Sequence, residues 1–391
     1  MLALLNTWAN TNSGSLNLEG LDKQMLLLKE NFIHLGGEIQ ELTLPSFKDI
    51  DTEGEPCKIA LGKALHVAKI RSNGTRVFLG GHMDTVFGKH SPFQTTSRQG
   101  NDTLQGPGVA DMKGGLVVLF IALLAFEKSP FANALSWEIL INPDEELGSP
   151  GSRAIFERIA KRNHFGLLFE PSFADGAFVS ERGGSWNVNI VVKGKAAHVG
   201  RNYHEGKSAL YAIAPLIAAL EALNASDVII NVGQLSSGRA ATIVPDIAVA
   251  KVNVRTETVR AMLQMQQAVE FLIRIHAREG ITITLVPATL RPPKPLDPQT
   301  KTLFSWLEQS SHDLGYPYKV RRTAGVSDGN ILASYGLPTI DTLGPIGSGL
   351  HTHEEHIVID SIVERAKLTA LLLMKVANGE YTLPQHKAIP L

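Results

Sequence analysis

The stretch FLGGHMDTVFG, residues 78–88, places two ionisable side chains, His82 and Asp84, directly after an apolar run. An apolar run of this kind is typical of a buried strand. Side chains alternate between the two faces of a strand, so residues two apart share a face and can approach the same point. An isolated His-x-Asp also fits a surface turn, because short motifs have a high false-positive rate. The rest of the chain has to decide between a site and a turn.

Predicted strands and helices alternate on both sides of this segment. Runs typical of buried strands lie at residues 64–70, 75–81, 136–142 and 165–170. Helical runs lie at residues 111–128 and 152–163, and the alternation resumes after residue 300, with a last helix from about Asp360 to Asn378. This order predicts an α/β fold, in which helices cover both faces of a sheet.

Residues 180–292 interrupt this alternation with a different order of elements. Strand-like runs lie at residues 185–194, 228–235, 248–256 and 281–287, and helical runs at residues 207–223 and 259–280. The order β-α-β-β-α-β predicts a ferredoxin-like unit, a four-stranded sheet with two helices on one face. We therefore expect an inserted domain over residues 180–292 and a first domain built from residues 1–179 and 293–391.

Composition favours a globular protein that acts on small molecules. The chain has 391 residues, 44% of them hydrophobic, which suits two domains or one large one. A formal net charge of -1 provides no basic surface, so we expect neither nucleic acid nor a membrane as a partner. The apolar run from Leu116 to Phe126 is too short to span a bilayer and predicts a buried core helix.

The single cysteine, Cys57, argues against a disulfide framework and against a cysteine-rich zinc module within the chain. A metal site would then have to use histidines and carboxylates. The N-terminal segment lacks the cationic start and apolar core of a signal peptide. Together these features predict a cytoplasmic location.

Four further motifs place acids or a histidine at the ends of predicted elements. GPGVADMKGG has Asp111 before a helix, INPDEELGS has Glu145 and Glu146 after a strand, LLFEPS has Glu170 at a strand end, and GLHTHEEH has His351. In open α/β sheets, ligands gather beyond the carboxyl ends of the strands. We therefore expect these side chains to meet there.

Each of these residues has a simpler explanation when it is taken alone. The alternatives are a helix N-cap for Asp111, a solvated loop for the acidic run at 144–146, a turn acid for Glu170 and a surface histidine for His351. Together these explanations are strained, because buried acids need compensating charge and these segments carry no matching set of Lys or Arg. Divalent cations such as zinc, which take imidazole and carboxylate ligands, would supply that charge.

Two histidines and three carboxylates suit two metal ions. If Asp111 bridges the ions, each ion has a histidine on one side, His82 or His351, and a glutamate on the other, Glu170 or Glu146. Two dications carry four positive charges, which three carboxylates and one bridging hydroxide would balance. Such a neutral site favours assembly in a buried cleft.

The order and wording of these motifs resemble the di-zinc metallopeptidase family that includes glutamate carboxypeptidase (carboxypeptidase G), acetylornithine deacetylase, succinyl-diaminopimelate desuccinylase and the aminoacylases. The resemblance runs from WANTNSGS at residues 8–15 to HTHEEH at residues 351–356 and is nearest to the glutamate carboxypeptidase branch. It implies a mixed-sheet α/β/α catalytic domain of the zinc-exopeptidase type with an inserted lid and dimerisation domain. It also implies two divalent ions per chain, namely zinc or, in its place, cobalt or manganese.

Carried over residue by residue, the resemblance implies one ion held by His82, Asp111 and Glu170, and a second held by Asp111, Glu146 and His351. Asp84 would hydrogen-bond the His82 imidazole, fix its tautomer and raise its basicity, which explains the spacing of the first motif. The resemblance further implies a cis peptide bond between Asp111 and Met112.

The resemblance also implies the residues that carry out the reaction. Glu145 would be the general base, which takes a proton from the water that bridges the metals and gives it to the leaving amine. His198, in GKAAHVG, matches a histidine that in family dimers crosses into the neighbouring subunit's cleft and stabilises the oxyanion. The alternative for His198 is an ordinary loop histidine. The resemblance thus predicts amide hydrolysis by a homodimer that forms through the inserted domain.

Three further residues match substrate-contacting positions of the family. Arg291, in TLRPPKP, matches an arginine that pairs with the free carboxylate of the substrate, since a guanidinium can hold a carboxylate through two parallel hydrogen bonds. A solvated arginine beside prolines is the alternative. Arg255, in VNVRT, matches a substrate or oxyanion contact, and Gly325, in AGVSDGN, matches a loop at the cleft.

The sequence therefore predicts a metal-dependent, carboxypeptidase-like hydrolase of N-acyl amino acids or short peptides that have a free carboxylate. An acetylornithine-type N-deacylase of amino-acid biosynthesis is the alternative within the same chemistry. A non-catalytic binding protein on the same fold is a more remote alternative, because fold alone does not establish function. Loss of Glu145 or of a metal ligand would favour that alternative, and the sequence retains all of these residues.

Overall fold

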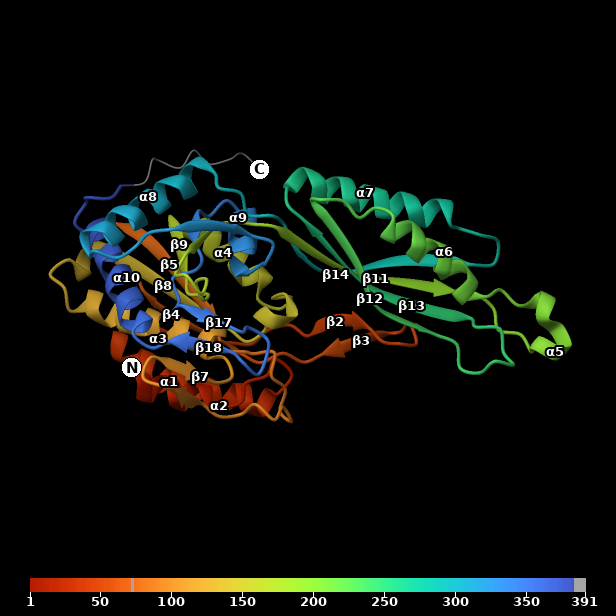
Figure 1. Ribbon diagram of the computed structural model, residues 1–391, viewed down its shortest axis with the longest axis horizontal. Helices are drawn as coiled ribbons and strands as arrows, with labels where there is room; N and C mark the ends of the chain where they lie inside the picture. The colour runs from red at the N-terminus through yellow and green to blue at the C-terminus, as the bar shows by residue number, and fades with distance from the viewer. Residues whose placement is uncertain (72–73, 383–391) are drawn as a thin grey trace.

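The computed structural model describes residues 1–71 and 74–382, which form two domains arranged side by side (Figure 1). The larger domain contains the first and last helices, α1 (Leu2–Ala9) and α10 (Ser361–Ala377). The smaller domain extends from it and begins and ends with strands, β11 (Gly184–Lys193) and β14 (Thr282–Arg291).

A six-stranded mixed sheet forms the centre of the larger domain. The strands are β1 (Glu38–Leu42), β4 (Ala64–Lys69), β8 (Leu135–Asn142), β5 (Thr75–His82), β9 (Phe165–Leu168) and β16 (Thr339–Ile340), in spatial order. From β8 to β16 neighbouring strands run parallel, whereas β1 and β4 pair antiparallel. Every residue of β8 is buried, as expected for a strand that is covered on both faces.

Alternate side chains of the central strands enter two different cores. Val77 and Leu79 of β5 belong to one core, and Phe78 belongs to the other. Helices that pack on the first core are α1, α2 (Leu18–Phe32), α3 (Gly114–Glu127), α8 (Pro298–Asp313) and α10. Those on the second core are α4 (Arg153–Arg162) and α9 (Asp328–Ser334). The predicted α/β/α architecture is therefore confirmed.

The apolar run at residues 116–126 forms α3, which packs in the first core. Within the described residues, Val109–Glu127 is the one helical stretch that is long and apolar enough to cross a membrane, but 78% of its most apolar window is buried inside the protein. The prediction of a core helix is confirmed.

The smaller domain is an antiparallel sheet with two long helices on one face. Between β11 and β14 the chain forms α6 (Ala209–Glu221), β12 (Val228–Ser237), β13 (Ile247–Thr256) and α7 (Val259–Ile275). The spatial order of the strands is β12-β13-β11-β14. Residues of both helices share a core with the sheet, including Leu216 and Val269. The element order is β-α-β-β-α-β, as the sequence predicts.

The chain enters and leaves the smaller domain at one place. The preceding strand, β10 (Phe178–Arg182), pairs with β15 (Val320–Thr323) near the C-terminal part of the larger domain. At the end of β10, the backbones of Arg182 and Lys294 exchange two hydrogen bonds of 3.0 and 2.9 Å. We keep residues 180–292 as the proposed extent of the insertion, whose sheet itself spans residues 184–291.

A hairpin that the sequence did not predict forms a second connection between the domains (Figure 1). It consists of β2 (Phe47–Ile50) and β3 (Pro56–Ile59). Ile50 packs against Val191 and Val249 of the smaller domain, and the Asp49 carboxylate lies 2.7 Å from the Lys251 ammonium. The hairpin contacts the sheet of the smaller domain at a second place, separate from the junction. It therefore helps to fix how the two domains are oriented.

Candidate active site

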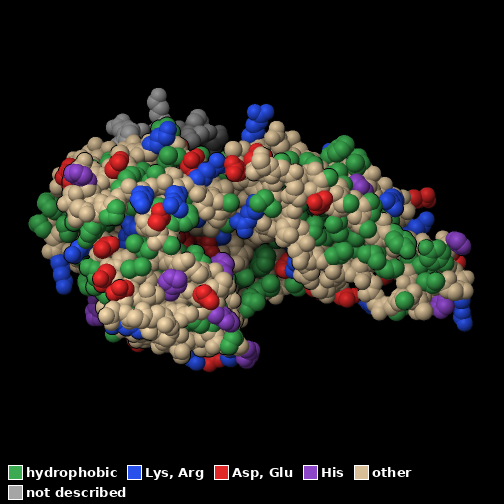
Figure 2. Space-filling model, in the orientation of Figure 1, with side chains coloured by type: hydrophobic (Ala, Val, Ile, Leu, Met, Phe, Trp, Pro, Cys, Tyr) green, Lys and Arg blue, Asp and Glu red, His purple; other side chains and the backbone are tan. Residues whose placement is uncertain are grey.

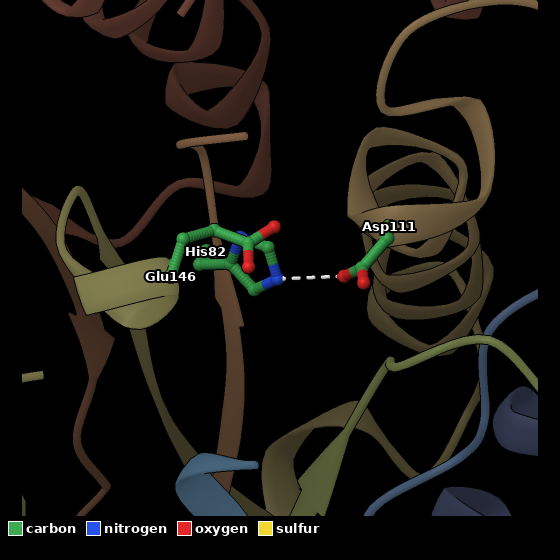
Figure 3. A group of neighbouring side chains, drawn as sticks. All are labelled: His82, Asp111 and Glu146. Carbon is green, nitrogen blue, oxygen red and sulfur yellow. Dashed lines mark hydrogen bonds and ion pairs between the residues drawn. The ribbon is translucent and has the colours of Figure 1, made fainter. Parts of the chain in front are cut away.

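His82 is the last residue of β5, and its ring orientation is fixed by hydrogen bonding. Its Nδ1 lies 2.9 Å from the backbone carbonyl oxygen of Asp84. A carbonyl can only accept, so Nδ1 carries the hydrogen and Nε2 is the atom left to bind another group. Nε2 points at the Asp111 carboxylate, with 3.0 Å between Nε2 and Oδ1 (Figure 3). Both side chains of the His-x-Asp motif are buried, which excludes the surface turn.

The Asp84 carboxylate has a different role from its carbonyl. It accepts the backbone N–H groups of Glu145 and Glu146 at 3.2 and 3.1 Å and the Ser15 hydroxyl at 2.7 Å. Its distance to His82 Nδ1 is longer, 3.4 Å. Asp84 therefore orients the imidazole mainly through its backbone and uses its side chain to hold the turn that carries the two glutamates.

Asp111 lies in an irregular turn directly before α3. The N-cap of α3 is Lys113, and Asp111 has non-helical backbone angles, φ -116° and ψ 92°, so Asp111 is not a helix cap. The peptide bond between Asp111 and Met112 is cis, as the resemblance implies. A Cβ on Gly115 would overlap the carbonyl oxygen of Phe169, so glycine allows the start of α3 to pack directly on the chain that leads to Glu170.

His351 reaches the same point from the other side of Asp111. It lies in the loop between β17 (Gly347–Ser348) and β18 (His356–Val358). Strand β18 pairs with β7 (Thr103–Gln105), the strand that precedes the Asp111 turn in the chain. His351 Nε2 is 3.3 Å from Asp111 Oδ2 and 3.4 Å from Glu146 Oε2. The two oxygens of Asp111 thus face two different histidines, as a bridging ligand would require.

The two glutamates divide between the two histidines. Glu146 contacts His351, whereas Glu170 Oε2 lies 3.9 Å from His82 Nε2. Glu145 and Glu170 are only 7% and 8% exposed. Glu145 is therefore not part of a solvated loop, and Glu170 is not a solvated turn acid. The structure therefore brings all five predicted metal ligands into one cluster.

The electrostatics of the cluster favour added positive charge. Burial raises the pKa of Glu146 and of Glu170, and the nearby charge of Asp111 raises them further. Burial acts in the same direction on Asp111, but hydrogen bonds from His351 and His82 outweigh it and lower its pKa. Hydrogen bonds of His351 to Asp111 and Glu146 raise the pKa of His351 to about 11. The acids thus favour positive charge at this point, which a bound cation would supply.

The residues fit a divalent cation. His82, Asp111 and Glu146 each offer one ligand atom, and these atoms lie within 4.8 Å of one another. Oε1 of Glu146 is buried without a hydrogen-bond partner in the described part of the chain. A buried carboxylate oxygen without a partner is costly unless a cation or a donor fills the space beside it. Imidazole and carboxylate ligands suit zinc and similar transition metals.

A cleft of ≈ 570 Å³ connects this cluster to the smaller domain. Figure 2 shows the surface hollowed between the two domains. One wall carries the acids and His351, and the other carries Arg255 and Arg291, with Gly325 at the rim. The three residues predicted to contact substrate therefore line the same cleft as the metal cluster.

Arg291 has a partner that local sequence could not reveal. Its Nη2 lies 2.9 Å from Glu145 Oε1 and 3.2 Å from Asp328 Oδ1, and it donates to the Glu145 carbonyl at 2.8 Å. Arg291 is 7% exposed, so it is not a solvated arginine. Burial raises the pKa of Glu145 to about 8, with the Arg291 charge opposing the rise. The inserted domain thus supplies, through Arg291, a cation that compensates part of the charge of these acids.

His198 is not brought to the cleft within its own chain. It is exposed and precedes the short helix α5 (Val199–Asn202), which lies at the far end of the smaller domain (Figure 1). Its Nδ1 accepts the backbone N–H of Gly200 at 3.1 Å, so the side chain caps α5. Within its own chain His198 is therefore a structural residue, the N-cap of a short helix, in line with the alternative of an ordinary loop histidine.

Three buried acids beside the site were not singled out from the sequence. Asp144 accepts the backbone N–H groups of Gly151 and Ser152 at 2.7 and 3.1 Å and so holds the turn that follows Glu145 and Glu146. Asp328 holds Arg291, and Glu355 accepts three N–H groups of the turn around Asp111. The only sequence signal was their position inside or beside the chemistry-bearing motifs.

Comparison with known proteins assigns the chain to a family. The model described as Peptidase family M20/M25/M40 matches residues 78–375. The chain belongs to this family. It is therefore a metal-dependent hydrolase of peptide or amide bonds, and the family resemblance expected from the sequence is confirmed.

Curated M20 relatives cover most of the chain. Carboxypeptidase G2 of Pseudomonas sp. (strain RS-16) is 27% identical over 369 residues, which are 89% of this chain and 85% of that protein. Succinyl-diaminopimelate desuccinylase of Pseudomonas syringae pv. tomato is 28% identical over 277 residues, 66% of this chain and 70% of that protein.

Solved M20 structures share the fold along almost the whole chain. The metallo-carboxypeptidase Sso-CP2 of Sulfolobus solfataricus superposes with a TM-score of 0.73 at 17% identity, over 96% of this chain and 99% of that one. The YXEP protein of Bacillus subtilis, a dinuclear metal-binding peptidase, gives 0.64 at 14% identity, over 96% and 97%. At these identities the likeness concerns the fold alone.

Proposed function

We propose that this M20 hydrolase cleaves the amide bond of an N-acyl amino acid or a short peptide whose leaving amino acid has a free carboxylate. The observation that carries the proposal is the distribution of charge across one cleft. Acids and His351 line the wall of the larger domain, and Arg255 and Arg291 line the wall of the smaller domain. Arg182 also lines the cleft, but its charge is paired with Asp341. A substrate that has its amide carbonyl at the first wall would present its carboxylate to the second.

His82, Asp111 and Glu170 would hold one divalent ion, and Asp111, Glu146 and His351 a second. Support comes from Asp111, whose two oxygens face different histidines, and from the unpartnered oxygen of Glu146. Zinc suits this ligand set, with cobalt or manganese as substitutes. Such ions polarise a substrate carbonyl and lower the pKa of the attacking water.

Glu145 is the proposed general base. Its backbone N–H is anchored on Asp84, and its carboxylate is held by Arg291, so its position in the cleft is fixed. Burial raises its pKa to about 8, which suits a group that accepts and then returns a proton near neutral pH. In the proposed reaction Glu145 takes a proton from the attacking water and gives it to the leaving amine.

Arg255 and Arg291 would bind the substrate carboxylate together. Ser185 of β11 pairs with Arg255 on one side and with Arg291 on the other, so both arginines project from the same face of the sheet. Burial lowers the pKa of Arg255, and the nearby charge of Arg291 adds to this effect. Among the described residues Arg255 forms no ion pair, whereas Arg291 has two acidic partners, so Arg255 supplies the uncompensated charge of this anion site.

We further propose a homodimer that forms through the smaller domain, in which His198 enters the cleft of the second copy. The exposed position of His198 supports an intermolecular role, since its own cleft does not include it. The outer face of α7 carries four exposed apolar side chains at helical spacing: Val259, Leu263, Phe271 and Ile275. Strand β12, at the edge of the sheet, adds exposed Ile229. Figure 2 shows hydrophobic side chains on the surface of the smaller domain. Exposed apolar side chains and an open sheet edge favour association with another chain.

Hydrolysis of a matched substrate panel tests the proposal. The enzyme, loaded with zinc, cobalt or manganese, is assayed on N-acyl amino acids and dipeptides that carry either a free carboxylate or a primary amide. We expect the free acids to be cleaved with much higher kcat/KM. Equal rates on both forms would contradict carboxylate recognition. A preference for N-acetylornithine above all other substrates would support the alternative of a biosynthetic N-deacylase.

A further inference from the structure

Glu355 is a buried carboxylate that contacts the turn around Asp111. It lies four residues after His351, directly before β18, and is 1% exposed. Its Oε1 accepts the backbone N–H groups of Ala110 and Asp111 at 2.8 and 3.0 Å, and its Oε2 accepts that of Gly108 at 3.1 Å. One side chain therefore satisfies three backbone donors of a single turn.

These donors need a partner because the turn is not helical. Asp111 and Met112 depart from helical backbone angles, and Gly108 has φ +70°, so the N–H groups of the turn do not join the hydrogen bonds of α3. Buried N–H groups without acceptors would favour a different backbone path. The path that directs the Asp111 carboxylate between His82 and His351 thus depends on Glu355.

Glu355 also links this turn to the loop that carries His351. The backbone N–H of Gly106 donates to the Glu355 carbonyl at 3.0 Å, and the Glu355 N–H donates to the Thr352 carbonyl at 3.2 Å. The Asp111 turn and the His351 loop are therefore hydrogen-bonded to each other through Glu355. A shift of Glu355 would move the two groups relative to each other.

We propose that Glu355 is a positioning residue that holds Asp111 and His351 in the relative placement that metal binding needs. The inference rests on the metal centre of the proposed function. Groups that orient metal ligands typically change metal affinity by about 10- to 100-fold when they are replaced. Replacement of Glu355 by glutamine keeps the size of the side chain but turns one acceptor into a donor that faces an N–H group.

The test compares Glu355→Gln with Glu354→Gln, the same chemical change one residue away. Glu354 is exposed, and its side chain forms no hydrogen bond or ion pair in the described structure, which makes it a matched control. Zinc affinity is measured by competition with a chromophoric chelator, alongside the melting temperature of the metal-free protein. We expect about 10- to 100-fold weaker zinc binding in Glu355→Gln, and wild-type binding in Glu354→Gln. Excess zinc should restore much of the lost activity.

Glu355→Asp keeps the charge on a shorter side chain and should give an intermediate zinc affinity, so it replaces the glutamine variant if that one does not fold. Wild-type zinc affinity in the folded Glu355 variants, even with a lower melting temperature, would overturn the inference and leave Glu355 a residue of the fold. Asp111→Asn separates this failure from that of the proposed function. If Asp111→Asn also bound zinc like the wild type, the metal centre itself would be wrong.

Discussion

The edge of the larger domain that carries the metal cluster and the far end of the smaller domain that carries His198 are built in opposite ways. At the metal cluster, predicted side chains from five separate motifs contact one another, and acids behind them fix the backbone. At the far end, His198 is exposed and bonds only within residues 198–202. The difference indicates that one chain can assemble the proposed metal centre and base alone, whereas a catalytic role of His198 would require a second chain.

The largest expected effect concerns the metal cluster, the region that one chain assembles alone. Glu145→Gln should reduce kcat by about 100- to 10,000-fold, because the amide fills the same space but cannot accept the proton. Metal content and melting temperature should stay close to those of the wild type. Glu308→Gln, an exposed position on α8, is the matched control. A near-normal kcat would mean that another group is the base.

The second prediction addresses the far end of the smaller domain. His198→Asn preserves the N-cap of α5, because asparagine is a good capping residue, but removes the imidazole. If His198 acts on the oxyanion, kcat should fall by about 100- to 1000-fold without loss of stability. Unchanged kcat would leave His198 as a helix cap only.

Mixing two inactive chains decides whether His198 acts across subunits. A dimer of one His198→Asn chain and one Glu145→Gln chain has one cleft with an intact Glu145 that would receive an intact His198 from the other chain. Activity should partly return after subunit exchange. No recovery in proven mixed dimers would argue against an intermolecular role.

The third prediction concerns Arg255 and Arg291, the two arginines that the smaller domain contributes to the cleft of its own chain. Loss of a charge-assisted contact in Arg255→Ala should lower kcat/KM by about 30- to 150-fold on substrates with a free carboxylate, mainly through KM. Substrates capped as primary amides should be affected much less. Arg291→Ala should lower kcat as well, because Arg291 also holds Glu145. If Arg255→Ala kept the wild-type preference for the acid, the carboxylate would be bound elsewhere.

The smallest expected effect concerns the hairpin that joins the two regions. Asp49→Asn should lower the free energy of unfolding by only about 0.2 to 1 kcal/mol, because the partly exposed Asp49–Lys251 pair is screened by solvent. Lys251→Gln should have a similar effect, and calorimetric unfolding measures both. A loss well above this range would show that the hairpin contributes more to the domain arrangement than one surface ion pair.

The fold and the metal cluster were predictable from sequence because both rest on local patterns. Strand and helix periodicity located the central sheet, and the expected ligands, such as His82 and Glu170, stand at the ends of elements whose carboxyl edges must meet. The β2–β3 hairpin was not predicted, since its strands have four residues each and only one of these residues, Ile50, is buried. Such short strands have no clear periodic signal.

What the sequence could not supply are contacts between segments that are far apart along the chain. The Arg291–Glu145 ion pair joins residues 146 positions apart, and the three N–H groups on Glu355 come from more than 240 positions away. No local spacing indicates either contact. Dimer formation, the identity of the metal and the cytoplasmic location likewise stay predictions, because they depend on molecules or surroundings outside one chain.

The junction between the domains suggests that the insertion is a cassette in the genetic sense. Because the backbones of Arg182 and Lys294 are hydrogen-bonded to each other, the two cut ends of the larger domain would already be neighbours if the insertion were deleted. A short turn in its place would complete an ordinary hairpin. Related chains could therefore gain, lose or exchange this segment during evolution without refolding the metal-binding domain. The proposed anion site of Arg255 and Arg291 would travel with the cassette, and so would the contact through which Arg291 holds Glu145.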